Sequence, residues 1–356
     1  MRSFLLNDPN SDIYANSLQL IAKYGIKPQR HAVITEDGYI LNIFRMPNKG
    51  PPVLLVHGVG DSSDSWLVTD RASSMAYQLS NLGFDVWLFN ARGNKYSQEH
   101  VRNLPMRQYW DFSFEEMGSR DMPAVIDYIL SSTGKEKLYY IGFSQGTSLF
   151  LVMCSVRPEY NAKIQHAVLL APVAWVSHLK YPFISLFAQN SNLLKTLLDG
   201  IGVYKIFENN LLLQLYRTKV CRDGVPENVF CEFEFALSFG IKNLTFLNIE
   251  RLPVIATHIN SGVSTATFVH YFQNYRSGQF QRRDYGSKTN TGVYKSNQPP
   301  EFDVSAVTLG ARWRCVEFPA IFIYLFLGIK YIGLGFDFSD RLCNILVYIA
   351  IEIHRY

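Results

Sequence analysis

The chain has little charge and no dense cluster of basic side chains. Charged residues make up 18% of its 356 residues, and the formal net charge is only +4. No run of Lys and Arg is dense enough to form a nucleic-acid surface, so we set that class of partner aside. No internal repeat or low-complexity linker divides the chain, and a hydrophobic share of 48% argues against a disordered chain or a coiled coil.

A signal-peptide core is also missing, and cysteines are few. The apolar run near the N-terminus covers only residues 4–6, and Asn7 and Asp8 follow it directly. Such a run is too short for the apolar region of a signal peptide. We therefore expect either a chain that is not secreted or a mature or incomplete form of a secreted one. Five cysteines is an odd number, which leaves at least one thiol unpaired if the others form bridges.

One long apolar run lies near the C-terminus. Residues 318–336 read FPAIFIYLFLGIKYIGLGF and carry a single charge, Lys330. These nineteen residues are close to the length that crosses a bilayer. Core strands or a buried helix explain the run as well, and Lys330 weakens the membrane interpretation. Both alternatives stay open.

The first half of the chain alternates short apolar runs with helical patterns, which predicts a parallel α/β sheet. Four buried strands are expected, at residues 51–56, 84–89, 138–141 and 167–171. A helix between the second and the third has one apolar face, made by Met122, Val125, Ile126, Ile129 and Leu130. Asp121 stands just before this face, where an N-cap carboxylate can accept backbone N–H bonds.

The pattern changes from about Trp175 to Asn274. Segments 192–201 and 210–216 look helical, and no buried strand of the earlier type is obvious before Asp303. We interpret this region as a helical insertion into the α/β core. The expected division is a core at 1–174, a helical cap at 175–300, a return to the core at 301–308 and a divergent apolar tail at 309–356.

A G-x-S-x-G motif, Gly142-Phe143-Ser144-Gln145-Gly146, directly follows the third expected strand. A helix-compatible stretch follows it, which is the strand–turn–helix context of a nucleophile elbow. In such an elbow a tight, strained turn lifts the serine hydroxyl out of the sheet, and bulky flanking residues would collide with neighbouring backbone. The pentapeptide alone is weak evidence, and the strand before it makes the evidence strong. The alternative is a plain strand–helix turn.

A serine nucleophile needs an oxyanion hole and a base. In this kind of fold the hole uses the N–H after the nucleophile, here Gln145, and one from the loop after an early strand. That loop reads HGVG at residues 57–60, so Val59 is expected to offer the second N–H. His57 precedes Ser144, whereas the base of such a site follows its nucleophile in the chain. We therefore expect a structural role for His57.

No histidine stands out as the base. His166 is placed at the start of its expected strand, away from the carboxyl end where active sites form. Lone histidines in the insertion are more often surface or satisfied core residues, and three fall there: His178, His258 and His270. His354 comes late enough, with Asp337 or Asp340 before it, so that Ser144, Asp337 and His354 have the correct order. Nothing around the last two resembles a loop that would present them.

Several segments, in order, carry a resemblance to a known family. Besides the elbow they are residues 16–25, 35–41, 57–66, 83–97, 109–118, 171–174, 252–258 and 284–286. Over about residues 10–308 the chain resembles the acid lipases, which include gastric and lysosomal lipases and insect relatives. The resemblance implies an α/β-hydrolase core with a helical cap. It also implies a serine ester hydrolase that acts on neutral lipid esters at a lipid–water interface, without a cofactor or a metal.

The resemblance also assigns roles to single residues. Ser144 matches the nucleophile, and Val59 and Gln145 match the oxyanion donors. The family usually has His where Phe143 stands, a position that flanks the nucleophile and transfers no proton.

Two further features of the family concern the cap. Cys221 and Cys231 match a cysteine pair that is bridged in relatives, which implies an oxidising secreted or lysosomal lumen. Asn243 begins an Asn-Leu-Thr sequon and is a candidate glycan acceptor.

The resemblance ends after Thr308. There the family continues with a strand, a loop with the catalytic Asp, a helix and a loop with the catalytic His, and this pattern does not follow here. We hypothesise that residues 309–356 come from non-coding sequence or an alternative splice form. Losing triad members typically leaves only a residual rate, about 10³–10⁴-fold above water. We therefore expect a lipase whose activity is impaired in this chain. The alternative is a non-catalytic lipid-binding or membrane-attached protein with a hydrolase fold, in contact with the membrane through residues 318–336.

Overall fold

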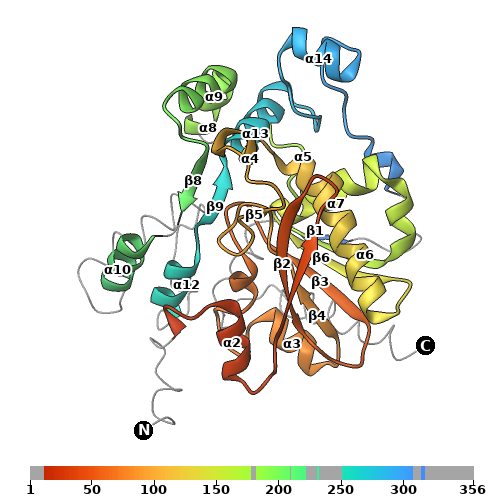
Figure 1. Ribbon diagram of the computed structural model, residues 1–356, viewed down its shortest axis with the longest axis vertical. Coiled ribbons are helices and arrows are strands. Elements are labelled where there is room, and N and C mark those ends of the chain that lie inside the picture. The colour runs from red at the N-terminus through yellow and green to blue at the C-terminus, as the bar shows by residue number, and fades with distance from the viewer. Residues whose placement is uncertain are drawn as a thin grey trace, which may run out of the picture.

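A mostly parallel sheet of eight strands forms the centre of the protein in the computed structural model, which describes residues 12–177, 182–208, 210–221, 231, 251–307 and 314–316 (Figure 1). The strand order is β1-β2-β4-β3-β6-β7-β10, with β5 paired to β2. The strands are β1 (Gln29–Ile34), β2 (Tyr39–Met46), β3 (Pro52–Val56), β4 (Asp85–Leu88), β5 (Glu99–His100), β6 (Leu138–Phe143), β7 (Ile164–Leu170) and β10 (Arg314–Val316).

The four expected strands are present as β3, β4, β6 and β7, and they pair in parallel. Strands β1 and β2 were not expected. They form an antiparallel hairpin in which Gln29 lies opposite Arg45 and Ile34 lies opposite Ile40. Most of β1 is exposed, so no apolar run marks it in the sequence.

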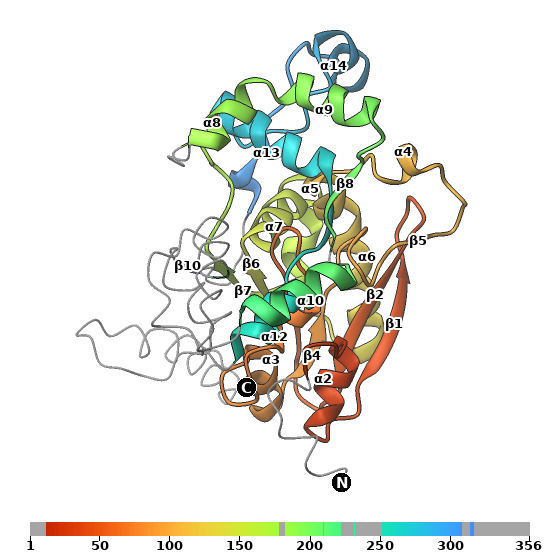
Figure 2. The ribbon, with the colours of Figure 1, turned by 90° about the vertical axis from the view of Figure 1, so that its left-hand side faces the viewer.

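Side chains alternate between the two faces of the central strands. Val53 and Leu55 pack on one face, and Leu54 and Val56 pack on the other. The first face is covered by α2 (Ser17–Lys23), α3 (Met75–Asn81) and α12 (Leu252–His258), and the second by α6 (Met122–Thr133) and α7 (Gln145–Val156) (Figures 1 and 2). Because both faces are buried, these strands are continuous apolar runs in the sequence.

Helix α6 has the expected apolar face, but the assignment of Asp121 as its N-cap is wrong. Four of the five expected residues are fully buried: Met122, Val125, Ile126 and Ile129. Asp121 has helical dihedrals, φ −68° and ψ −48°, makes no capping bond, and ends a π-helical turn, Met117–Asp121. The helical stretch begins earlier, at Ser113, whose hydroxyl accepts the Glu115 N–H while Glu116 accepts the Ser113 N–H. Backbone N–H groups near Asp121 are therefore inside a helix that is already capped.

The inserted region contains helices, but it is not wholly helical. Its helices are α8 (Pro182–Gln189), α9 (Ser191–Gly200), α10 (Leu211–Val220), α12, α13 (Thr265–Ser277) and α14 (Ser287–Tyr294). Two strands, β8 (Lys205–Glu208) and β9 (Ser261–Ser264), pair antiparallel between them, and β9 is buried. This corrects the expectation that no buried strand occurs there. The sequence of β9, SGVS, holds a single apolar residue and gives no strand pattern.

Helices α8, α9, α13 and α14 gather beyond one end of the sheet (Figure 2). Together with α10, α12 and the two short strands we call them the cap. Past Thr308, strand β10 pairs in parallel with β7, and Arg314 lies opposite Val168. The apolar run 318–336 and the candidates Asp337, Asp340 and His354 lie outside the described residues. Among the residues that are described, no helix is both long and apolar enough to span a bilayer.

Candidate functional site

Ser144 occupies a strained turn between β6 and α7. Its dihedrals are φ 49° and ψ −113°, a conformation that residues other than glycine rarely adopt. The Ser144 N–H donates to the Leu170 carbonyl over 2.9 Å, which fixes the turn to the end of β7. Its neighbours Phe143 and Gln145 are buried, whereas Ser144 is partly exposed. The turn therefore presents the serine to solvent at the carboxyl edge of the sheet.

The backbone packs so closely around the two glycines of the motif that no side chain fits at either position. A Cβ on Gly142 would lie 2.7 Å from the carbonyl oxygen of Gly146, and a Cβ on Gly146 would lie 2.5 Å from that of Val56. Both neighbours are backbone atoms, which cannot swing away as a side chain can. The expectation that these positions must be small is confirmed.

The loop after β3 lies against this turn. A Cβ on Gly58 would be 3.5 Å from the Ser144 Cβ and 3.2 Å from the Phe143 ring. Gly60 has φ +67°, so the loop turns sharply just after Val59, which is partly exposed. Of the residues expected to form an oxyanion hole, Gln145 follows Ser144 directly, and Val59 follows Gly58, which packs against the Ser144 turn.

Two hydroxyls in the first turn of α7 hold the site together, and the sequence reasoning missed both. Thr147 Oγ1 donates to the Ser144 carbonyl over 2.6 Å and accepts the Val173 N–H over 2.9 Å. Ser148 Oγ donates to the Val173 carbonyl and receives the Tyr271 hydroxyl from α13 at 3.1 Å. The only signal is that hydroxyls in a first helical turn tend to bond nearby backbone groups.

His57 is buried between two backbone segments. Its Nδ1 donates to the Gly58 carbonyl over 2.8 Å, and its Nε2 accepts the Ala91 N–H over 3.1 Å. Burial lowers the pKa of His57 to about 4, so the ring is neutral at physiological pH. As expected, the residue is structural: it connects the loop after β3 to the loop after β4.

Two cap histidines are satisfied core residues, as expected. His258 contacts Asp64 at 2.6 Å and the Asp12 carbonyl at 2.9 Å, and His270 contacts Ser113 Oγ at 3.0 Å and the Gln281 carbonyl at 2.8 Å. His166 lies near the start of β7 and stacks on Tyr139. Within the described ranges no histidine hydrogen-bonds to Ser144. His178 lies outside them.

The cap cysteines Cys221 and Cys231 form a disulfide with a Cα–Cα distance of 5.2 Å, and both are fully buried. Cys154 on α7 is a buried free thiol. Asn243 lies outside the described residues. In the part of the chain that the structure describes, no three His, Cys, Asp or Glu side chains gather as metal ligands would.

Comparisons with known proteins agree with this architecture. The family described as "alpha/beta hydrolase fold" matches residues 51–207, and the "Partial alpha/beta-hydrolase lipase region" matches residues 18–70. A thermophilic esterase from Thermogutta terrifontis has a TM-score of 0.44 at 14% identity, over 92% of this chain and 99% of that chain, which is too low to inform function.

Curated relatives are much closer in sequence. Lipase 1 of Drosophila melanogaster is 38% identical over 82% of this chain, which spans 64% of that protein's length. Gastric triacylglycerol lipase of Mus musculus is 35% identical over 85% of this chain and 78% of its own. Lipase member K of Homo sapiens is 35% identical over 84% and 76%. The chain belongs to the acid-lipase family of α/β hydrolases, the family of the gastric and lysosomal lipases.

Proposed function

We propose that this chain hydrolyses carboxylic esters of neutral lipids with Ser144 as the nucleophile. The supporting observation is the strained, partly exposed serine with Gly58 packed against it. In this mechanism Ser144 Oγ attacks the ester carbonyl carbon, and the N–H groups of Val59 and Gln145 stabilise the tetrahedral oxyanion. Removing one such donor costs about 10²–10³-fold in kcat in comparable sites.

We expect impaired turnover, because the described histidines offer Ser144 no base for proton transfer. A serine hydroxyl needs a base, and His57, His258 and His270 each use both ring nitrogens in other contacts. After Thr308 the sequence does not follow the family pattern that carries the catalytic Asp and His. Sites without triad members keep about 10³–10⁴-fold acceleration over water from the oxyanion hole and substrate binding.

The test is ester hydrolysis by the purified chain and its Ser144→Ala variant. Tributyrin and a p-nitrophenyl ester are suitable substrates, and a fluorophosphonate reports serine reactivity without turnover. We expect slow hydrolysis and slow labelling that both vanish in Ser144→Ala. Ser131→Ala, on an exposed face of α6, is the matched control and should behave as wild type. Activity that survives Ser144→Ala would overturn the proposal.

We also propose that the cap contacts the lipid surface through α9. Leu193 and Leu197 of α9 are 57% and 58% exposed, and Ile201, which caps the end of the helix, is 74% exposed. Their spacing of four residues puts the three side chains along one side. Exposed apolar stripes of this kind mark protein, ligand or membrane contacts rather than ordinary surface. Neutral lipid droplets would cover this stripe, which lies in the cap at the end of the sheet remote from α3 (Figures 1 and 2).

Binding to a tributyrin emulsion measures this contact without catalysis. The double variant Leu193→Ser/Leu197→Ser should leave more protein in the aqueous phase than wild type. Leu82→Ser, at the end of α3, replaces a leucine that is 53% exposed and serves as the control. Equal partitioning of all three proteins would rule the stripe out as the lipid contact.

The oxidised cap also supports a proposed location in a secreted or lysosomal lumen, since disulfides persist in oxidising compartments. Asn243 would then be open to glycosylation. Treating protein from secretory cells with peptide N-glycosidase should lower its mass, and Asn243→Gln should remove that shift. Wild-type protein that shows no shift would remove the glycan from the proposal.

A further inference from the structure

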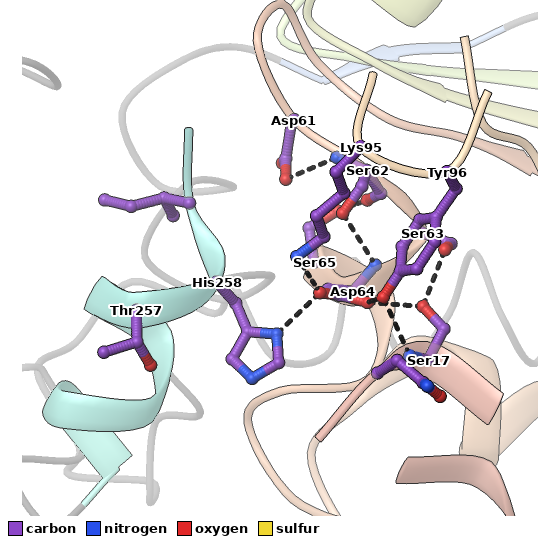
Figure 3. Close-up of polar contacts among 12 residues, drawn as sticks. Ser17, Asp61, Ser62, Ser63, Asp64, Ser65, Lys95, Tyr96, Thr257 and His258 are labelled. Atoms are coloured by element: carbon purple, nitrogen blue, oxygen red, sulfur yellow. Dashed lines mark hydrogen bonds and ion pairs between the residues drawn. The ribbon is translucent and has the colours of Figure 1, made fainter. Parts of the chain in front are cut away.

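His258 connects the cap to the core through both nitrogens of its ring. It is 4% exposed and ends α12 in the cap. Nδ1 lies 2.6 Å from Asp64 Oδ2, and Nε2 lies 2.9 Å from the Asp12 carbonyl oxygen. Figure 3 shows the ring reaching from α12 to Asp64. Both partners belong to the part of the chain that precedes β4.

These two contacts require a proton on each ring nitrogen. The Asp12 carbonyl can only accept, so Nε2 must donate. Burial alone would raise the pKa of Asp64, but the charges and hydrogen bonds of Lys95 and His258 hold that pKa well below its usual range. Asp64 is therefore a carboxylate that only accepts, so Nδ1 must donate as well. His258 satisfies both contacts only as an imidazolium.

The other two buried histidines near the site are arranged differently. His57 accepts a backbone N–H at Nε2, which a doubly protonated ring cannot do. His270 faces a carbonyl and the Ser113 hydroxyl, which lies within hydrogen-bond distance of Glu116 as well. A hydroxyl can either accept or donate, so these contacts do not require a proton on both ring nitrogens. Burial lowers the pKa of each of these two histidines to about 4, so both are neutral from pH 5 to pH 8. Of these three described histidines, His258 is the one whose two partners, a carboxylate and a carbonyl, can both only accept.

Asp64 in turn organises the segment that follows the oxyanion loop. It lies in a 3₁₀ turn, Ser63–Trp66, and is fully buried. Besides His258, its carboxylate accepts the hydroxyls of Ser17 and Tyr96, the latter at 2.7 Å, and the ammonium of Lys95. The turn is thus tied to α2 and to the loop after β4. Losing one of these donors would leave the others to hold a buried negative charge.

The cap also contacts the oxyanion loop directly, just after His258. Asn260 turns the chain with φ 67°, and the Ser261 N–H then donates to the Gly60 carbonyl over 2.7 Å. The Ser261 carbonyl accepts the Lys95 N–H over 2.8 Å. Only two residues of cap backbone, Ile259 and Asn260, thus separate His258 from Ser261, whose N–H orients the peptide after Gly60.

We propose that His258 is a positioning residue whose imidazolium holds the Asp64 turn and the loop of Gly58–Gly60 beside Ser144, and that loss of one proton from its ring loosens this loop. The consequence for chemistry rests on the proposed role of Val59 in the oxyanion hole. We call the contacts of His258 with Asp64 and Asp12 the clamp. The clamp itself does not depend on the role of Val59. Ester hydrolysis that relies on this loop would then be favoured by acid and weakened by alkali, without titration of any group that touches the substrate.

Charged groups from several elements surround His258. Asp64 faces Nδ1, and Lys95 shares the same Asp64 oxygen. On the other side the Asp12 carboxylate pairs with Lys23 and with Arg251 of the cap.

Two more ionisable groups bear on the clamp. Arg217 of α10 donates to the carbonyls of Ala256 and Ile259, on either side of His258. Asp61 lies in the loop itself, and burial raises its pKa to about 7. Because Asp61 would itself change charge between pH 5 and pH 8, a test of the His258 contacts must remove it.

The protonation state can be measured directly in the wild-type protein. We expect nitrogen NMR of protein labelled with ¹⁵N in its histidine rings to show His258 protonated on both nitrogens at pH 5. His57 and His270 should each show one protonated nitrogen under the same conditions. A neutral His258 ring at pH 5 would overturn the proposal, and this measurement needs no substitution at position 258.

Hydrogen exchange then tests the mechanical consequence, in an Asp61→Asn background. Amide protection at residues 58–65 should be about tenfold lower at pH 8 than at pH 5 after correction for intrinsic exchange, because one buried charged contact is lost. Adding His258→Gln should lower protection at pH 5 and abolish its pH dependence. Adding His270→Gln, the matched cap control, should leave the pH dependence of this loop intact. A pH dependence that survives His258→Gln would assign it to another group and overturn the proposal.

The clamp and the proposed function can fail separately. Ser144→Ala should leave the exchange pattern of residues 58–65 unchanged. If hydrolysis and fluorophosphonate labelling are absent while the exchange pattern is as expected, the catalytic proposal fails and the clamp stands. If hydrolysis by wild type falls from pH 5 to pH 8 without any change in loop protection, the clamp is not its cause.

Discussion

The hydroxyl of Thr147 lies 2.6 Å from the carbonyl oxygen of Ser144 and donates to it. The same hydroxyl accepts the N–H of Val173, which follows β7 at the point where the chain enters the cap. One side chain therefore connects the strained peptide at Ser144 to the segment that carries the cap. Backbone strain at a site persists only where the surroundings hold it, and this contact is part of that support.

Replacing Thr147 by Val should loosen the elbow without changing its volume. The Val173 N–H loses its acceptor, which costs about 1–2 kcal/mol of folding free energy, and Ser144 should react more slowly with a fluorophosphonate. Thr147→Ser keeps the hydroxyl and should restore most of the labelling rate. Thr291→Val, on exposed α14, is the control: it removes a hydroxyl that bonds to Ser287 of its own helix, and it should label as fast as wild type. If Thr147→Val labelled as fast as wild type, the hydroxyl would have no positioning role.

Gly146→Ala should destabilise the protein, whereas Gly292→Ala should not. The new Cβ would lie 2.5 Å from the Val56 carbonyl oxygen, so β3 and α7 must move apart. Overpacking of this kind lowers the free energy of unfolding by about 1–3 kcal/mol, which urea denaturation can measure. Gly292→Ala is the control, because no atom lies within 4 Å of its added Cβ and α14 is exposed there. That variant should be neutral or more stable by up to about 1 kcal/mol.

Asp121→Asn should show how much a buried ion pair contributes to the free energy of unfolding. Arg92 and Asp121 are completely buried, with Nη2 and Oδ1 2.5 Å apart, and Arg92 also pairs with Asp37 at 2.7 Å. Removing the Asp121 charge leaves the guanidinium with one carboxylate, and we expect a loss of about 3 kcal/mol in the free energy of unfolding. Glu159→Gln breaks an exposed pair and should cost less than about 1 kcal/mol. Similar losses for both variants would contradict this ranking.

Because the pKa of Asp61 is raised, we expect the free energy of unfolding to fall as pH rises from about 4 to 7. Burial raises the pKa of Asp61 from 3.8 to about 7, so in this window the folded protein binds more protons than the unfolded chain. Stability then decreases with pH, because deprotonation is easier after unfolding. Asp61→Asn should remove this slope and raise the free energy of unfolding at pH 8 by roughly 2 kcal/mol. A variant whose slope matches wild type would show that Asp61 is already ionised in the folded protein.

The sequence predicted the parts of the fold whose signal is local. Strands β3, β4, β6 and β7 are buried on both faces and are visible as apolar runs, whereas exposed β1 and the four-residue β9 are not. The assignment of Asp121 failed for a similar reason. Its partner Arg92 is distant in sequence, and the capping box at Ser113, which the sequence does contain, had already started the helix.

The candidate site divides in the same way. The elbow at Ser144 and the glycines around it follow from a contiguous motif and its preceding strand. The contacts of His258 join residues separated by 194 and 246 positions, so no pattern along the chain reveals them. Ser148 and Tyr271 likewise meet only because α13 returns over α7.

Reduction of the cap disulfide should weaken the cap's attachment without affecting Cys154. The bridge joins Cys221, directly after α10, to Cys231, ten residues later, and both half-cystines pack in the same core cluster as α12. Closing a loop of this size stabilises a fold by about 2–3 kcal/mol in the chain-entropy account. We therefore expect dithiothreitol, or the double variant Cys221→Ala/Cys231→Ala, to lower the free energy of unfolding by about that amount. Because α10 packs against α12, hydrogen exchange in α12 should rise at the same time.

Cys154→Ala is the control for the loss of a buried sulfur. Its stability should fall through packing alone, and dithiothreitol should still destabilise it as it does wild type. The double variant Cys221→Ala/Cys231→Ala, by contrast, should not respond to dithiothreitol. If dithiothreitol destabilised it as much as it destabilises wild type, the redox effect would lie elsewhere in the chain.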